Sequence, residues 1–353
     1  MTYIDPHRKL MHHIERIAQI RKGEQPAPVN VEIDLTNRCN LGCAGCHFAH
    51  THSRGPLAGS AKPAGMLDVG DQMDTALAQW IIDDLCANGV QSITWTGGGE
   101  PTLHPAFDEI MQYAAGRIDN GIYTNGTLVN ANRAAILKRG MKWVYVSLDE
   151  SDAYSYKLRK RTDGFDKAIA GIQNLVEAEG DATIGVGFLI DLENVHRIDD
   201  MVELGAYLQC DYIQFRPLIE FAPDNPGKPI IAYGWIEEAI ERLDRVSGAG
   251  IEVDISRFEM LRRWQGHGYP VCYWTQLQTV ITPNGRVWTC VNRRGFQGDE
   301  IGDMSREPFY DIWQRSSPYM VNHNCRVLCR GHIPNQTLTH MMDGAGDRHR
   351  SFI

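Results

Sequence analysis

The stretch CNLGCAGCHF, residues 39–48, follows an apolar, β-branched run, VNVEIDL, at residues 29–35. Three cysteines, Cys39, Cys43 and Cys46, therefore come directly after an expected strand. Such a group can bind zinc, form a disulfide or hold an iron–sulfur cluster. Structural zinc typically takes four ligands in two widely spaced pairs, whereas three close-set thiolates favour a cubane cluster that leaves one iron open.

The composition is that of an ordinary soluble protein. The 353 residues are 43% hydrophobic and 22% charged, with a net charge of -9. This charge gives no general basic surface for nucleic acid. We see no apolar run of about 18 residues and no signal peptide, so we expect a cytoplasmic protein without a membrane partner. In that compartment, the nine cysteines are better explained as ligands and buried thiols than as a disulfide framework.

Strand and helix patterns alternate from residue 29 to about residue 250. Six strand–helix units follow one another, which predicts parallel strands with helical crossovers. Six units are too few for the closed eight-unit barrel, so a partial barrel and an open sheet are both compatible with the pattern.

Chemically unusual residues follow these strands. In parallel α/β folds the carboxyl ends of the strands converge on the active site. Turn preferences explain the glycines and asparagines there, but not the whole set. The set comprises Cys39, Cys43, Cys46, Glu100, Ser147, Asp149 and Arg216.

The cysteine spacing, together with GGGEP at residues 97–101 after the second strand, resembles the radical S-adenosylmethionine (SAM) superfamily. The resemblance covers roughly residues 29–250 and implies a partial (β/α)6 barrel. It also implies that Cys39, Cys43 and Cys46 hold a [4Fe–4S] cluster whose open iron chelates SAM. Reductive cleavage of SAM would then yield a 5′-deoxyadenosyl radical that abstracts hydrogen from a substrate.

The resemblance extends to cofactor-binding residues. The backbone at Gly98 and Gly99, which lacks Cβ atoms, would accept the SAM ammonium with help from Glu100. Ser147 and Asp149 alternate along the fourth strand and would bind the ribose hydroxyls from one face.

Three further residues are assigned in the same way. Arg216 is a natural partner for a carboxylate of SAM or substrate, or else forms a surface ion pair. Asn125 would contact SAM or substrate, or else serves only the TNGT turn. Phe48 would pack on adenine, because Gly45 stands where the family often has an aromatic residue.

The pattern changes after residue 250. TVITPNGRVWTC, residues 279–290, predicts a β-hairpin, and a helical PFYDIWQR follows. Together with four more cysteines, Cys272, Cys290, Cys325 and Cys329, this resembles the twitch/SPASM extensions that hold an auxiliary [4Fe–4S] cluster. Zinc is the alternative, because four thiolates also suit it. We therefore divide the chain into an N-terminal helical segment (1–28), a barrel (29–250) and an auxiliary cluster domain (251–353). The N-terminal segment resembles a single amphipathic helix, with Leu10, Ile14, Ile17 and Ile20 roughly on one face.

Layout and family resemblance favour a small polar substrate. We expect a sugar, nucleoside or aminocyclitol in natural-product or antibiotic biosynthesis, changed by decarboxylation (as of cytosylglucuronate), dehydrogenation or epimerisation. The alternative is a maturase that modifies a ribosomally made peptide or another enzyme. An electron-transfer module is disfavoured, because a carrier needs no GGGEP or SLD at strand ends. A flavodoxin or ferredoxin is the expected electron donor.

Overall fold

The computed structural model describes most of the chain. The described residues are 6–43, 46, 67–218, 220–222, 225–230, 234–246, 250–296, 298–321, 325 and 329–343. Phe48 and most of the Gly-, Pro- and His-rich stretch after the first cysteines lie outside these ranges.

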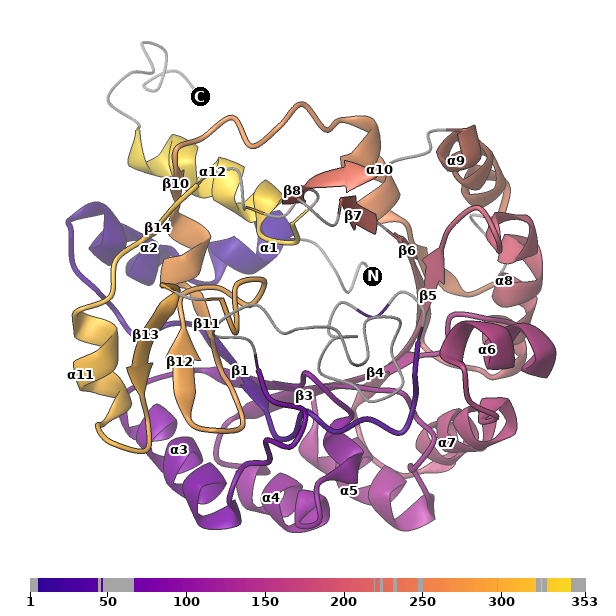
Figure 1. Ribbon diagram of the computed structural model, residues 1–353, viewed down its shortest axis with the longest axis horizontal. Helices are drawn as coiled ribbons and strands as arrows, with labels where there is room; N and C mark the ends of the chain where they lie inside the picture. The colour runs from indigo at the N-terminus through magenta and orange to yellow at the C-terminus, as the bar shows by residue number, and fades with distance from the viewer. Residues whose placement is uncertain are drawn as a thin grey trace.

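One ten-stranded sheet organises the molecule, in the order β13-β12-β11-β1-β2-β3-β4-β5-β6-β9 (Figure 1). Its middle consists of six parallel strands in chain order. They are β1 (Asn30–Asp34), β2 (Ser92–Thr96), β3 (Asp119–Thr124), β4 (Trp143–Ser147), β5 (Thr183–Ile190) and β6 (Tyr212–Pro217). A short parallel strand, β9 (Glu252–Asp254), follows β6 at the edge.

Helices cover the outside of this curved sheet. Figure 1 shows the strands curving round the centre of the molecule with the helices on the outer side, as in a partial barrel. These helices are α3 (Thr75–Ala87), α4 (Phe107–Ala114), α5 (Ala131–Gly140), α6 (Ala153–Lys160), α7 (Phe165–Glu177), α8 (Ile198–Tyr207) and α9 (Gly234–Val246), with the short 3-10 turns η2 (Pro101–Leu103) and η3 (Val195–Arg197). The predicted α/β class and partial barrel are thereby confirmed. Helix α6 was not anticipated from the sequence.

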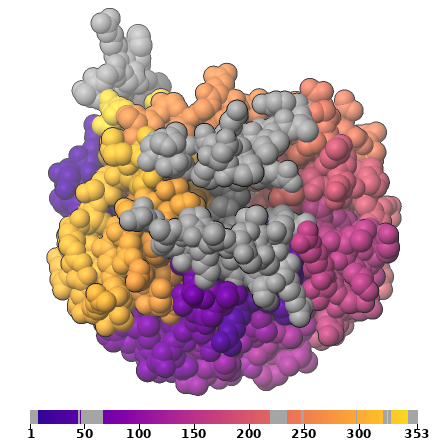
Figure 2. Space-filling model, viewed as in Figure 1, coloured from indigo at the N-terminus to yellow at the C-terminus, as the bar shows by residue number. Residues whose placement is uncertain are grey.

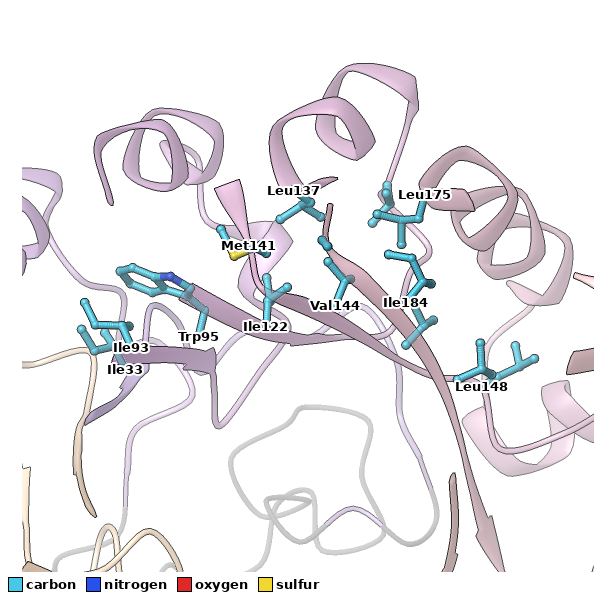
Figure 3. Close-up of a cluster of buried hydrophobic side chains, with 14 of the residues drawn as sticks. Ile33, Ile93, Trp95, Ile122, Leu137, Met141, Val144, Leu148, Leu175 and Ile184 are labelled. Carbon is cyan, nitrogen blue, oxygen red and sulfur yellow. The ribbon is translucent and has the colours of Figure 1, made fainter. Parts of the chain in front are cut away.

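The main core lies between the sheet and the helices. Ile122 and Ile184 project from the strands toward the side on which Leu137 and Leu175 of the helices lie (Figure 3). Because strand side chains alternate between faces, the other set of strand residues points to the inside of the barrel. That inner set includes several buried polar side chains, which form the candidate site.

The C-terminal part continues the same sheet. The predicted hairpin is confirmed: β11 (Gln278–Ile281) and β12 (Arg286–Trp288) pair antiparallel, and β13 (Glu300–Asp303) follows. Strand β11 pairs in parallel with β1, so the extension is hydrogen-bonded to the barrel. In the space-filling view the orange and yellow C-terminal segments lie across the molecule from the pink helices after β4 and β5 (Figure 2). The boundary proposed at residue 250 stays a prediction.

Shorter elements complete the described chain. They are α1 (Pro6–Met11), α2 (Ile14–Arg21), β7 (Glu220–Ala222), β8 (Asn225–Ile230), α10 (Ser256–Arg262), β10 (Val271–Cys272), η4 (Tyr273–Gln276), α11 (Phe309–Gln314), β14 (Tyr319–Met320) and α12 (His332–Met342). None of the helices within the described ranges is long and apolar enough to span a bilayer.

The N-terminal segment differs from the single amphipathic helix that we expected. Two short helices, α1 and α2, pack against α12 through buried Leu10, Ile17 and Ile20, which contact Leu338. Ile14, expected on the same face, is instead 54% exposed. The chain turns between the helices, so the spacing that would align Ile14 with Leu10 in one continuous helix does not apply.

Candidate active site

The first cysteine group follows β1 directly. Burial raises the pKa of Cys39 to about 12, and nearby Glu100, Cys43 and Cys46 add to this effect. The loop is tied down where the Gly42 amide donates to the carbonyl oxygen of Lys160, at 2.9 Å. The fold therefore places three thiols within electrostatic reach of one another at the carboxyl end of β1.

The glycine turn after β2 packs against this loop. A Cβ on Gly99 would overlap the carbonyl oxygen of Arg38, and one on Gly98 would overlap the side chain of Asn37. The Glu100 amide donates to the same Arg38 carbonyl at 2.8 Å. Glycine is therefore needed at positions 98 and 99 because the turn after β2 and the loop after β1 approach each other closely. The expected SAM contact at Gly98 and Gly99 stays a prediction.

Glu100 joins the loops after β2 and β3. Its Oε1 accepts hydrogen bonds from the hydroxyls of Thr102 and Thr124, both at 2.6 Å. Its Oε2 accepts from the Asn125 amide at 2.7 Å. Burial raises the pKa of Glu100, and these hydrogen bonds oppose that rise. The carboxylate therefore joins the loops after β2 and β3, and its expected contact with SAM stays a prediction.

Asn125 is likewise part of a buried network. Its Nδ2 donates to Oδ1 of Asn40 in the cysteine loop at 2.8 Å, and its Oδ1 accepts from the Thr127 hydroxyl at 2.7 Å. The Nδ2 of Asn40 donates to that same hydroxyl at 2.8 Å. Asn125 thus orients the loop between Cys39 and Cys43 and does more than serve its own turn.

Asp149 lies differently from our expectation. Strand β4 ends at Ser147, and Asp149 adopts a left-handed backbone with φ 68°, so strand alternation does not extend to it. Its carboxylate forms a buried ion pair with Lys160 and accepts the Leu189 amide at 2.9 Å. Burial raises the pKa of Asp149, but Lys160, the Leu189 amide and Arg216 together make the net shift downward. Ser147, partly buried and paired in register with Gly187, ends the strand as predicted.

Arg216 faces the inside of the barrel and forms no ion pair with the side chains that the structure describes. Its guanidinium carbon lies 4.8 Å from the centre of the Tyr145 ring. Its Nε is buried and has no hydrogen-bond partner within the described part of the chain. Burial lowers its pKa, but the surrounding Tyr145, Tyr123 and Asp149 make the net shift upward. The expected binding of a carboxylate by Arg216 stays a prediction.

Sequence reasoning missed an ion network inside the barrel. Glu32 and Asp34 point inward from β1, and both pair with Arg294, whose Nη2 lies 2.8 Å from Oε2 of Glu32. Arg330 also pairs with Glu32. The signal was present in VNVEIDL, because two acids at alternate positions of a buried strand require partners. Lys160, which ends α6 and pairs with Asp149, was also not singled out from the sequence.

The second cysteine group gathers from four segments of the extension. Burial raises the pKa of Cys290 to about 12, with Cys329 and Cys325 adding to it. Burial and the other three thiols likewise raise the pKa of Cys272. Asn292 Nδ2 donates to Cys329 Sγ at 3.3 Å. These thiols thus form one group near β1.

No three His, Cys, Asp or Glu side chains within the described ranges converge as they would on a single metal ion.

Comparison with known proteins agrees with this geometry. The Radical SAM superfamily model matches residues 33–205, and the model of SPASM, an iron–sulfur cluster-binding domain, matches residues 272–337. Mycofactocin maturase MftC of Mycobacterium ulcerans is 31% identical over 311 residues, which cover 82% of this chain and 75% of that protein. The chain belongs to the radical SAM superfamily. Membership implies SAM and a [4Fe–4S] cluster as cofactors, and the SPASM match implies auxiliary iron–sulfur binding.

Two further likenesses span most of this radical SAM chain. A probable GTP 3′,8-cyclase of Methanothermobacter thermautotrophicus is 29% identical over 317 residues, covering 82% of this chain and 95% of that protein. The crystal structure of Streptococcus suis SuiB has a TM-score of 0.63 at 17% identity, covering 89% of this chain and 72% of that one, which shows a shared fold. The chain spans about half the length of some other curated relatives, 44% and 54% in two cases.

Proposed function

We propose that this chain is a radical SAM enzyme that modifies a ribosomally made precursor peptide. The likeness to a mycofactocin maturase carries the proposal, because it runs through both the radical SAM region and the SPASM region. SuiB, which shares the fold, has also been crystallised with its precursor peptide SuiA. The sugar or nucleoside substrate that we expected from the sequence has weaker support.

The residues divide the work as follows. Cys39, Cys43 and Cys46 would hold the first cluster, and Cys272, Cys290, Cys325 and Cys329 the auxiliary one. When bound, the first cluster and SAM supply a 5′-deoxyadenosyl radical that removes hydrogen from the substrate. Glu100, Asn125 and Asn40 fix the cysteine loop, so the thiols are held ready for iron. We keep flavodoxin or ferredoxin as the proposed electron donor.

The remaining cofactor contacts are proposed from the positions of residues at the ends of the strands. Ser147 and the turn at Gly98 and Gly99 lie at the carboxyl ends of β4 and β2, two parallel strands of one sheet with β3 between them, where SAM would sit. Arg216 is reserved for an anion because its guanidinium has no carboxylate partner in the described part of the chain. Phe48, outside the described residues, keeps its proposed place beside adenine.

A nucleotide substrate is the second candidate. The likeness to a GTP 3′,8-cyclase favours it, because that alignment covers nearly all of the relative. The barrel interior offers arginines that would suit a phosphate as well as a carboxylate.

The experiment uses the anaerobically reconstituted chain with dithionite and SAM. We expect 5′-deoxyadenosine from the wild type and none from Cys43→Ala, because two thiolates do not hold an open-iron cubane. Cys86→Ala is the matched control, since Cys86 lies on α3 outside both groups, and it should keep full activity. Cleavage that persists in Cys43→Ala would remove the assignment.

Substrate class is tested with the same preparation. A short peptide encoded beside the gene should change in mass when SAM and reductant are present. An unchanged peptide together with consumption of GTP would favour the nucleotide candidate instead.

A further inference from the structure

Asn292 joins two cysteines of the auxiliary group through its N–H groups. Its side-chain Nδ2 donates to Cys329 Sγ at 3.3 Å, and its backbone amide donates to Cys290 Sγ at 3.4 Å. The Gly331 amide is a further donor to Cys329 Sγ, also at 3.3 Å. Three N–H groups therefore point at two sulfurs that come from different segments of the extension.

These donors fit sulfurs that carry negative charge. A neutral thiol is only a weak hydrogen-bond acceptor, whereas the thiolate is the form that binds metal. The N–H groups are therefore better satisfied when Cys290 and Cys329 are thiolate ligands, as the SPASM match implies. Hydrogen bonds to the sulfurs are one of the factors that set the reduction potential of an iron–sulfur cluster.

The backbone that follows Asn292 is held firmly. Arg293 places its Nε 2.9 Å from Oδ2 of Asp299, and each of these side chains is 10% exposed. Arg294 places its Nη2 2.8 Å from Oε2 of Glu32 on β1. Two buried arginines, each anchored to a carboxylate, thus come directly after Asn292 and restrict its movement relative to the sulfurs. Fixed donors of this kind orient and tune the ligands of a metal site.

Reduction of the cluster changes the strength of these hydrogen bonds. One added electron increases the negative charge that the irons and sulfurs share. Because charge-assisted hydrogen bonds are stronger than neutral ones, the N–H groups stabilise the reduced cluster more than the oxidised one. Their presence therefore raises the reduction potential.

We propose that Asn292 raises the reduction potential of the auxiliary cluster and so makes that cluster a better acceptor for the electron of the substrate radical. A radical that gives one electron to the cluster also gives one proton to water, and it becomes the oxidised product. Asn292 acts through the two sulfurs and is a positioning residue. The inference rests on the auxiliary cluster of the proposed function, and it is the same for a peptide and for a nucleotide substrate.

The test is an anaerobic redox titration of the reconstituted full chain, followed by electron paramagnetic resonance. Cys43→Ala, which should not hold the first cluster, identifies the signal of the auxiliary cluster. In that background Asn292→Leu removes the side-chain donor and keeps a side chain of similar size. We expect the ratio of reduced to oxidised cluster at a fixed potential to fall about tenfold, a shift of about 59 mV to more negative potential.

Asn292→Asp and Asn284→Asp form a matched pair of controls. Each adds one negative charge to the extension, but Asn284 is exposed and its side chain contacts Thr282 and Asp71 rather than a sulfur. We expect a fall of about 30-fold or more for Asn292→Asp and of about twofold or less for Asn284→Asp. Asn292→Gln keeps the amide on a longer side chain and should recover part of the loss seen in Asn292→Leu.

A second measurement needs no substitution at Asn292. The wild type is prepared with asparagine that carries the heavy nitrogen isotope in its side-chain amide. Pulsed electron paramagnetic resonance of the reduced auxiliary cluster should then detect a coupling to that nitrogen, because Nδ2 donates directly to a ligand sulfur.

Three results would overturn the inference. One is an unchanged potential in Asn292→Leu with about four irons still bound. Another is an equal shift in Asn292→Asp and Asn284→Asp, which would attribute the effect to charge at a distance. The third is a wild type without coupling to the labelled nitrogen. Each of these can occur while SAM cleavage and product formation persist, so the proposed function is judged separately.

Discussion

At the level of single residues, Arg294 joins the auxiliary extension to the barrel. It reaches from the loop after β12 to Glu32 and Asp34 on β1, and all three side chains are buried. In an Arg294→Met variant, Asp34 would have no cation beside it. Removing one partner from a buried pair costs about 3–5 kcal/mol. We expect a loss of this size in the free energy of unfolding, measured by anaerobic urea denaturation.

Arg286 is the matched control for this prediction. It pairs with Glu300 at 2.9 Å, but the two side chains are 47% and 34% exposed. An exposed ion pair of this kind contributes about 1 kcal/mol or less, so Arg286→Met should have little effect. Equal losses in the two variants would show that the inward network does not stabilise the fold.

At the level of elements, we expect packing of α2 against α12 to hold the N-terminal segment on the protein. Ile17 is 3% exposed and packs in the cluster with Leu338 of α12, whereas Ile14 on the same helix is 54% exposed. Truncating a buried isoleucine to alanine costs about 2–5 kcal/mol, because it removes apolar contact and leaves a cavity. We expect Ile17→Ala to lower the unfolding free energy accordingly, measured by thermal or urea denaturation.

Ile14→Ala changes the same residue type in the same helix and should alter stability by less than about 0.5 kcal/mol. A comparable loss at Ile14 would instead support the single continuous helix that we inferred from the sequence.

At the scale of the whole molecule, β1 connects the two cysteine groups. Its carboxyl end leads to Cys39. Its inner face binds Arg294 and Arg330 of the extension, and its edge opposite β2 pairs with β11. We therefore expect about eight irons per reconstituted chain, in two [4Fe–4S] clusters. A Cys290→Ala variant should retain about four irons, still release 5′-deoxyadenosine, and make little or no product.

The reason is that a substrate radical needs an electron partner after hydrogen loss, and the auxiliary cluster is the nearest candidate. Rapid freezing and electron paramagnetic resonance should show that radical accumulating in Cys290→Ala. No radical, together with lost substrate binding, would mean that the extension only shapes the cavity. Zinc in the second cysteine group would contradict the auxiliary cluster itself.

Local features were predictable because they depend on residues close together in the chain. The alternation of strands and helices, the close-set cysteines, the glycine turn and the hairpin at residues 279–290 were all read from patterns of this kind. The partial barrel then follows from parallel strands with crossover helices. Ile14 shows the limit of such patterns, because one turn in the backbone moved it out of the expected face.

What the sequence by itself determined is therefore the order of the elements and the chemistry at the ends of the strands. Only the tertiary structure decided which charges meet: Arg294 reaches Glu32 across 262 residues, and Asp149 is paired with Lys160. The physical reason is that a buried charge is stabilised by groups near it in space, and folding alone brings those groups together.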